Sequence, residues 1–188
     1  PIKSSAASDV YKRQTYMAEI KKSGIITICG RPNVGKSTLT NALVGEKVAI
    51  VTNKPQTTRN HICGVRTRGE SQFVFVDTPG LHKARTRLGD YMVNVVKESV
   101  ADVDAVMLLV EPIPNVGAPE EQLIARIKTL RCPAVLVINK VDTLEHKEKL
   151  LEVIQVYGQA HDFTAVVPIS AKSGEGVEEL LGVLEGFL

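Results

Sequence analysis

One octapeptide near the start of the chain constrains its fold more than any other segment: Gly30-Arg31-Pro32-Asn33-Val34-Gly35-Lys36-Ser37. Its spacing is G-x-x-x-x-G-K-[ST]. It follows a short β-branched run, Ile25–Cys29, and it opens Ser37–Val44, whose apolar residues recur at helical spacing before Gly45. A strand, a glycine loop and a helix in this order direct backbone N–H groups toward an anion. The octapeptide therefore predicts a phosphate-binding loop; the competing interpretation is a chance match in an ordinary strand-to-helix turn.

Two polar side chains of this loop have predicted roles of their own. The Lys36 ammonium supplies positive charge to the β- and γ-phosphates of a nucleotide, and the Ser37 hydroxyl coordinates Mg²⁺. The predicted phosphate-binding set comprises Gly30, Arg31, Pro32, Asn33, Val34, Gly35, Lys36, Ser37 and Thr38.

The rest of the chain alternates between short apolar runs and segments of helical period. Further strands are predicted at His61–Thr67, Gln72–Val76, Val103–Glu111, Ala134–Ile138 and Ala165–Ile169. Helices are predicted at Tyr91–Val100, Pro119–Leu130, Glu145–Gln159 and Glu175–Phe187, and a loop at Val48–Asn60. This alternation predicts an α/β fold with a parallel sheet and helices on both faces. Functional loops are then expected beyond the carboxyl ends of the strands.

The composition argues against several other classes of protein. Apolar residues make up 44% and charged residues 23% of the chain, which is typical of a soluble globular domain. A net charge of +2 is too near neutral to indicate nucleic-acid or membrane binding. No apolar run reaches the roughly 18 residues of a membrane span. Cys29, Cys63 and Cys132 lack C-x-x-C spacing and are predicted to be reduced, packed thiols.

A second motif, Asp77-Thr78-Pro79-Gly80, follows the predicted strand Gln72–Val76. A carboxylate at a strand end beside a phosphate loop is placed to hold Mg²⁺. The backbone N–H of Gly80 is then placed to sense the γ-phosphate. The alternative is an ordinary Pro-Gly turn capped by Asp77.

A third motif indicates which base is bound. Asn139-Lys140-Val141-Asp142 follows the apolar strand Ala134–Ile138. The carboxylate of Asp142 can accept hydrogen bonds from N1–H and the exocyclic amine of guanine, whereas adenine would leave it unpaired. The motif therefore predicts GTP and argues against an ATP-dependent kinase or ATPase. The alternative is a surface turn.

A fourth, shorter motif, Ser170-Ala171-Lys172, follows the last predicted strand. The backbone N–H of Ala171 is expected to meet O6 of guanine, and Lys172 to lie along the base. The tripeptide is a weak signal by itself, and its value comes from its position at a strand end.

Four such motifs in this order resemble the signature of the Ras-like superfamily of P-loop GTPases. The resemblance implies a mostly parallel six-stranded sheet with one antiparallel edge strand. Lys54-Pro55-Gln56-Thr57-Thr58-Arg59-Asn60 and Asp77-Thr78-Pro79-Gly80-Leu81-His82-Lys83 are further similar to the Era family of ribosome-assembly GTPases. The alternative is a related tRNA-modification or double-domain ribosome GTPase, which usually carries G-T-T-R-D.

The resemblance implies catalytic roles for Lys36, Thr58, Gly80 and Asn33. Thr57 and Thr58 are both candidates for the switch threonine on Mg²⁺, and Thr58 is preferred, so the implied metal ligands are Ser37, Thr58 and Asp77. Leu81 stands where many relatives have a water-orienting glutamine, which implies slow hydrolysis or, as an alternative, a binding module with negligible turnover. Asn33 implies a K⁺ ion beside the phosphates; its alternative role is to brace the loop.

The resemblance also implies a domain organisation. Residues 1–16 are expected to be a foreign or disordered tail, and residues 17–188 a GTP-binding domain. The KH domain of the family, which binds small-subunit ribosomal RNA, is expected to be absent from this sequence. In its full-length form the protein is expected to act in small-subunit assembly and 16S rRNA maturation. A monomeric domain, a bacterial cytoplasmic location and peripheral contact with the inner membrane are implied on the same basis.

Overall fold

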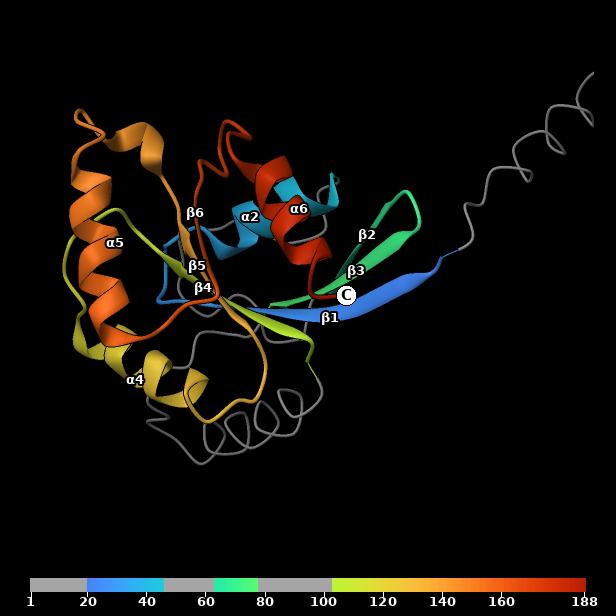
Figure 1. Ribbon diagram of the computed structural model, residues 1–188. Helices are drawn as coiled ribbons and strands as arrows, with labels where there is room; N and C mark the ends of the chain where they lie inside the picture. The colour runs from blue at the N-terminus through green and yellow to red at the C-terminus, as the bar shows by residue number, and fades with distance from the viewer. Residues whose placement is uncertain (1–19, 46–62, 78–102) are drawn as a thin grey trace, which may run out of the picture.

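The strands form one mixed sheet. The computed structural model of the chain describes residues 20–45, 63–77 and 103–188. The strands it describes are β1 (Lys22–Cys29), β2 (Cys63–Arg68), β3 (Ser71–Asp77), β4 (Ala105–Val110), β5 (Ala134–Ile138) and β6 (Ala165–Pro168). They form a six-stranded sheet in the order β2-β3-β1-β4-β5-β6 (Figure 1). β2 runs antiparallel to β3 at one edge and the other pairs are parallel, which confirms the expected sheet.

Helices cover both faces of this sheet because its central strands are apolar on both sides. The described α-helices are α2 (Lys36–Val44), α4 (Ala118–Ile127), α5 (Lys149–Ala160) and α6 (Val177–Glu185). Leu39 and Leu43 of α2 pack with Leu180 and Leu184 of α6 in one core cluster. α4 and α5 contribute Leu123, Ile127, Val153 and Tyr157 to a second cluster. Figure 1 shows these two pairs of helices on opposite sides of the sheet.

The register of the parallel strands brings their carboxyl ends to one edge. β1 pairs with β3 through Ile28 and Asp77, and with β4 through Cys29 and Leu108. β4 and β5 end side by side at Val110 and Ile138. The loops that follow these strands therefore open on the same side of the molecule, as expected for a ligand site in an α/β sheet.

Element boundaries differ from the predicted ones where a tertiary contact decides them. β1 begins at Lys22, not Ile25, because Lys22 pairs with Ser71 of β3. The predicted helix start at Glu145 is wrong: a short 3₁₀ helix, η1 (Val141–Thr143), comes first and α5 begins at Lys149. The start of α6 at Glu175 is also wrong, because Glu175 pairs with Ser170 in an isolated bridge and the helix begins at Val177.

Several sequence predictions lie outside the described residues. They are the tail at 1–16, the loop Val48–Asn60, the first residues of the strand His61–Thr67 and the helix Tyr91–Val100. Among the residues that the structure describes, no helix is both long enough and apolar enough to cross a membrane.

The described cysteines are free thiols, as predicted. Cys29 is buried and Cys132 is partly buried. The thiol of Cys29 donates to the carbonyl of Met107 at 3.3 Å. Burial raises the pKa of Cys29 to about 12, against the smaller lowering effects of the Lys36 charge and a backbone hydrogen bond.

Cys29 is accordingly expected to resist alkylation in the folded protein. Because the thiolate is the reactive form, iodoacetamide at pH 8 should label Cys29 at least about 100-fold more slowly than after unfolding in urea. Mass spectrometry of the Cys29 peptide measures this ratio. A folded-state rate within a few fold of the urea rate would show that β1 opens readily.

Candidate functional site

The glycine loop between β1 and α2 is packed closely against its neighbours. Gly35 has a φ of 100°, and a Cβ built there would lie 2.3 Å from Nδ2 of Asn139. A Cβ on Gly30 would lie 2.5 Å from the carbonyl oxygen of Leu109. Both positions therefore require glycine, for backbone approach and, at Gly35, for the left-handed conformation. The ammonium of Lys36 donates to the carbonyl oxygens of Gly30 and Arg31, both at 2.9 Å, so it lies within the loop.

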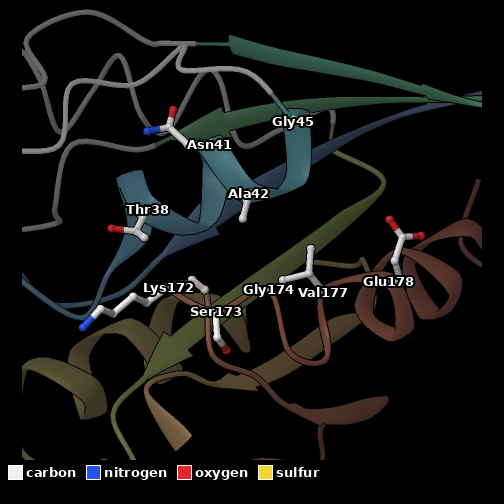
Figure 2. A pocket seen from close by; sticks show the side chains of 10 residues that line it. Thr38, Asn41, Ala42, Gly45, Lys172, Ser173, Gly174, Val177 and Glu178 are labelled. Carbon is white, nitrogen blue, oxygen red and sulfur yellow. The ribbon is translucent and has the colours of Figure 1, made fainter. Parts of the chain in front are cut away.

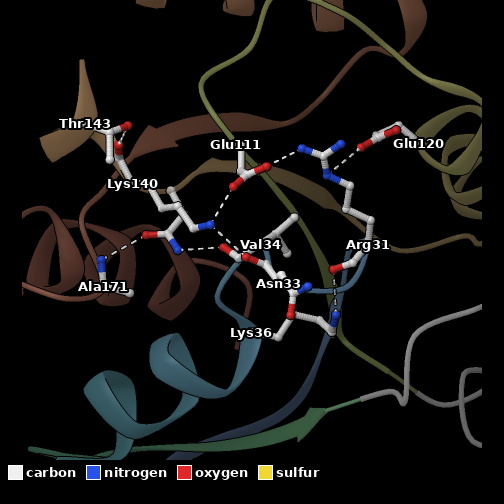
Figure 3. A network of polar contacts seen from close by, with 10 residues as sticks. Arg31, Asn33, Val34, Lys36, Glu111, Glu120, Lys140, Thr143 and Ala171 are labelled. Carbon is white, nitrogen blue, oxygen red and sulfur yellow. Dashed lines mark hydrogen bonds and ion pairs between the residues drawn. The ribbon is translucent and has the colours of Figure 1, made fainter. Parts of the chain in front are cut away.

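Asn139, the first residue after β5, ties three loops together. Its side chain is buried, with 2% exposure. Its Nδ2 donates to the carbonyl of Val34 in the glycine loop at 2.8 Å, and its Oδ1 accepts the N–H of Ala171 at 2.9 Å (Figure 3). In this structure the N–H of Ala171, expected to meet guanine O6, thus has a partner inside the protein. Asn139 acts here as a structural bridge between the motifs.

A network of four charged side chains, Arg31, Glu111, Glu120 and Lys140, lies beside the phosphate loop (Figure 3). Lys140 has a φ of 64°, and its ammonium donates to the carbonyl of Asn33 at 2.8 Å and to Oε1 of Glu111 at 2.5 Å. The other oxygen of Glu111 accepts from the guanidinium of Arg31. Arg31 Nε lies 3.4 Å from Oε1 of the buried Glu120. Burial alone would raise the pKa of Glu111, but Lys140 and Arg31 outweigh it and hold the pKa below its ordinary value.

The two carboxylates of this charged network, Glu111 and Glu120, were not among the predicted site residues. Glu111 was predicted only as the last residue of a strand, and Glu120 only as part of the helix Pro119–Leu130. The available signal was the position of Glu111, an acidic residue at the carboxyl end of a fully buried strand. Nothing local marks Glu120 as the buried partner of Arg31.

The remaining guanine-motif residues lie at the ends of β5 and β6. Asp142 is exposed in η1, and Lys172 is exposed after β6. Ser170 is fully buried, and its hydroxyl accepts the N–H of Ser173 at 3.3 Å. An open pocket of about 590 Å³ lies between the segment from Thr38 to Gly45, which includes most of α2, and the segment from Ala171 to Glu178 (Figure 2).

The predicted Mg²⁺ ligands are described only in part. Ser37 is the second residue of α2, and the backbone of Asp77 ends β3 beside Ile28 of β1. Thr57, Thr58, Thr78, Pro79, Gly80 and Leu81 lie outside the described residues. Within residues 20–45, 63–77 and 103–188, no group of three or more His, Cys, Asp or Glu side chains could hold a metal ion.

The fold and the loops together define a class of protein. A six-stranded, mostly parallel sheet carries a G-x-x-x-x-G-K-[ST] loop after β1, and the loops after β5 and β6 converge on it. This is the arrangement of a Ras-like P-loop nucleotide-binding domain.

Comparison with known proteins identifies the family. Residues 25–140 match the family described as 50S ribosome-binding GTPase. The chain belongs to this family, and it is a GTP-binding domain of the Era type. GTPase Era of Ruminiclostridium cellulolyticum is 48% identical over 160 residues, which cover 85% of this chain and 53% of that protein.

Solved structures of Era agree with this assignment. An Era variant from Aquifex aeolicus bound to GDP and AlF₄⁻ superposes with a TM-score of 0.82 at 35% identity, over 89% of this chain and 57% of that one. Era in complex with MgGDPNP and a segment of 16S ribosomal RNA gives the same values: a TM-score of 0.82 and 35% identity, over 89% and 57% of the two chains. The chain therefore spans about half the length of the relatives it matches.

Proposed function

We propose that this chain is the GTP-driven switch of an Era-type ribosome-assembly protein. It binds GTP, hydrolyses it to GDP and phosphate, and changes conformation between the two states. The observation that carries the proposal is the contact of Asn139 with Val34 and Ala171, which gathers the phosphate loop and both guanine loops at one edge of the sheet.

The phosphate end of the nucleotide is assigned to the loop between β1 and α2. Backbone N–H groups of the glycine loop other than Pro32, together with the start of α2, face the phosphates, and Lys36 neutralises charge on the β- and γ-groups. Thr38 follows this loop in the first turn of α2. We assign the γ-phosphate side to Asp77, Thr78, Pro79 and Gly80, of which the backbone of Asp77 alone lies within the described residues.

The residues present fit a magnesium ion at this end. The start of α2 holds Ser37, and the register places Asp77 beside β1 just before Gly30. Ser37, Asp77 and Thr58 would hold the ion. Bound Mg²⁺ supplies charge neutralisation at the β- and γ-phosphates during phosphoryl transfer.

The guanine base is assigned to the loops after β5 and β6. Asp142 accepts hydrogen bonds from the base, the backbone around Ser170 and Ala171 approaches its O6 edge, and Lys172 and Lys140 lie along its faces. Exposure of Asp142 in η1, just after β5, supports this role, because an exposed carboxylate is available to a ligand. The N–H of Ala171 would then be shared between the base and Asn139.

Hydrolysis without a water-orienting glutamine requires help from elsewhere in the site. Leu81 offers no hydrogen bond, so positioning and positive charge must supply the catalysis. We assign that charge to a K⁺ ion beside Asn33, whose side chain is exposed on the phosphate loop.

This assignment predicts faster GTP hydrolysis in KCl than in NaCl, by at least about tenfold if K⁺ replaces part of the contribution of an arginine finger. Asn33→Ala should remove the difference. Asn33→Gly should remove it too. This second variant controls for backbone strain in Asn33→Ala, because glycine keeps the φ of 64° at this position without strain. Phosphate release at equal ionic strength measures both. Equal wild-type rates in the two salts would exclude the K⁺ role.

A nucleotide-binding module with negligible turnover is the second candidate, and Leu81 is the observation that favours it. Phosphate release over many turnovers separates the two candidates. Continued release with GTP but not with ATP supports the enzyme, and release of no more than one phosphate per chain supports the binding module. Equal affinity for ATP and GTP would contradict the assignment of guanine.

The wider role belongs to the whole protein, of which this chain spans about half. We propose that the full-length protein acts in small-subunit assembly and 16S rRNA maturation, with rRNA bound by a KH domain outside this sequence. The solved Era complex with MgGDPNP and 16S ribosomal RNA supports these partners. A cytoplasmic site of action, peripheral contact with the inner membrane and a monomeric isolated domain stay predictions from the family resemblance.

A further inference from the structure

Glu111 contacts basic side chains from two different loops of the site (Figure 3). It directly follows β4, which lies between β1 and β5 in the sheet. One carboxylate oxygen accepts from Lys140 Nζ at 2.5 Å, and the other pairs with the guanidinium of Arg31. Arg31 belongs to the phosphate loop and Lys140 to the guanine loop. A single carboxylate therefore bridges the two halves of the nucleotide site.

Lys140 and Arg31 each also take part in a further hydrogen bond with a residue of the phosphate loop. Lys140 also donates to the carbonyl of Asn33, at 2.8 Å. The carbonyl of Arg31 accepts from Lys36 Nζ at 2.9 Å. Movement of the carboxylate would thus disturb Lys36 through Arg31, and the backbone that leads to Asp142 through Lys140.

The three side chains of the bridge are partly shielded from water, which strengthens their electrostatic interaction. The Glu111 side chain is 23% exposed, and those of Arg31 and Lys140 are 34% and 36% exposed. Charge-assisted hydrogen bonds in such partly excluded positions are stronger than exposed surface pairs. The lowered pKa of Glu111, set by Lys140 and Arg31 against the opposing effect of burial, keeps the carboxylate ionised at neutral pH.

We propose that Glu111 is a positioning residue that couples the phosphate loop to the guanine loop, slowing nucleotide release and sharpening selectivity for guanine. The inference rests on the proposed function. Glu111 acts through Arg31 and Lys140. Without its charge, the two cations lose their common partner; Arg31 keeps Glu120, and Lys140 keeps the carbonyl of Asn33.

Glu111→Gln in the full chain tests the coupling, because glutamine keeps the size of the side chain and removes the charge. We expect a fluorescent GDP analogue to dissociate about tenfold faster from this variant, as the loss of a charge-assisted bridge predicts. The preference for GTP over ITP should also fall severalfold. Inosine lacks the exocyclic amine that Asp142 recognises, so this ratio reports how well the guanine loop is positioned.

Two matched variants separate coupling from simple charge loss. Glu120→Gln removes the other partner of Arg31 and leaves the contact between Glu111 and Lys140, so it should change release and selectivity less than Glu111→Gln. Glu185→Gln removes a half-buried carboxylate that pairs with Arg68 and Ser71 at the amino end of β3. It should match the wild type in both readouts.

Glu111→Asp keeps the experiment decisive if the glutamine variant fails to fold. It retains the charge on a side chain one methylene shorter, which draws the carboxylate back from Arg31 and Lys140, so release should again be faster. Wild-type release and an unchanged GTP-to-ITP ratio in either folded variant would overturn the proposal, as would a lowered melting temperature with both readouts unchanged. A wild-type chain without preference for GTP over ATP would count against the proposed function instead.

Discussion

Replacing Asn139 by alanine is expected to lower the free energy of unfolding by about 2–4 kcal/mol and to abolish measurable GTP binding. The side chain is 2% exposed and satisfies the carbonyl of Val34 and the N–H of Ala171. Its removal leaves two buried polar groups without this partner, each costing about 1–3 kcal/mol. The loops that hold the phosphates and the base also lose their shared anchor.

Urea unfolding of the nucleotide-free chain measures the stability loss. Asn115→Ala is the matched control, because the Asn115 side chain is exposed and the described hydrogen bonds of this residue use its backbone: the N–H donates to the carbonyl of Ile113, and the carbonyl accepts from Tyr157. The control should unfold within about 0.5 kcal/mol of the wild type. A loss below about 1 kcal/mol for Asn139→Ala would show that the loops are held together by other contacts.

Replacing Asp142 by alanine is expected to lower GTP affinity at least about 100-fold while leaving the fold intact. A site built to accept the N–H groups of a base discriminates strongly when one partner of those hydrogen bonds is missing. Asp142 is exposed in η1, so its loss should cost the folded chain little. Asn139→Ala and Asp142→Ala, three positions apart, are thus both expected to weaken GTP binding, but only Asn139→Ala is expected to lower stability.

Equilibrium titration with a fluorescent GTP analogue and a thermal melt of the same samples check this expectation. Asp162→Ala removes an exposed carboxylate from the loop before β6 and should bind GTP normally. An Asp142→Ala chain that keeps wild-type affinity would remove the basis for assigning guanine. A chain that loses binding together with its melting transition would assign Asp142 a structural role.

Local pattern predicted most of the described fold. The β-branched runs before Gly30 and Asn139 became β1 and β5, and the Gly45 stop ended α2 as expected. Predictions failed at element starts. Helical period continued upstream of Lys149, but the backbone of Lys140 adopts a φ of 64° and turns into η1 before α5 can begin. In this conformation Lys140 contacts Asn33 and Glu111, which lie 107 and 29 positions away and so outside any local window.

In the candidate site, too, local sequence predicted the motifs, and contacts between distant residues decided how they are arranged. Glycine, lysine and serine at fixed spacing predicted the phosphate loop, because a backbone cradle for phosphate needs those residue types in that order. The partners within the site were not predictable in this way. Asn139 was expected to belong to base recognition, yet its side chain joins Val34 and Ala171.

The sequence by itself predicted a P-loop domain, because the residues that make the phosphate loop, the strands and the helices lie close together along the chain. The Era type was predicted from the resemblance of two short segments to that family. Only the tertiary structure decided how the motifs are bound to one another. Glu111 meets Arg31 across 80 positions and Lys140 across 29. Contacts at such separations arise from the order and register of strands in the sheet, which bring the ends of β1, β4 and β5 together.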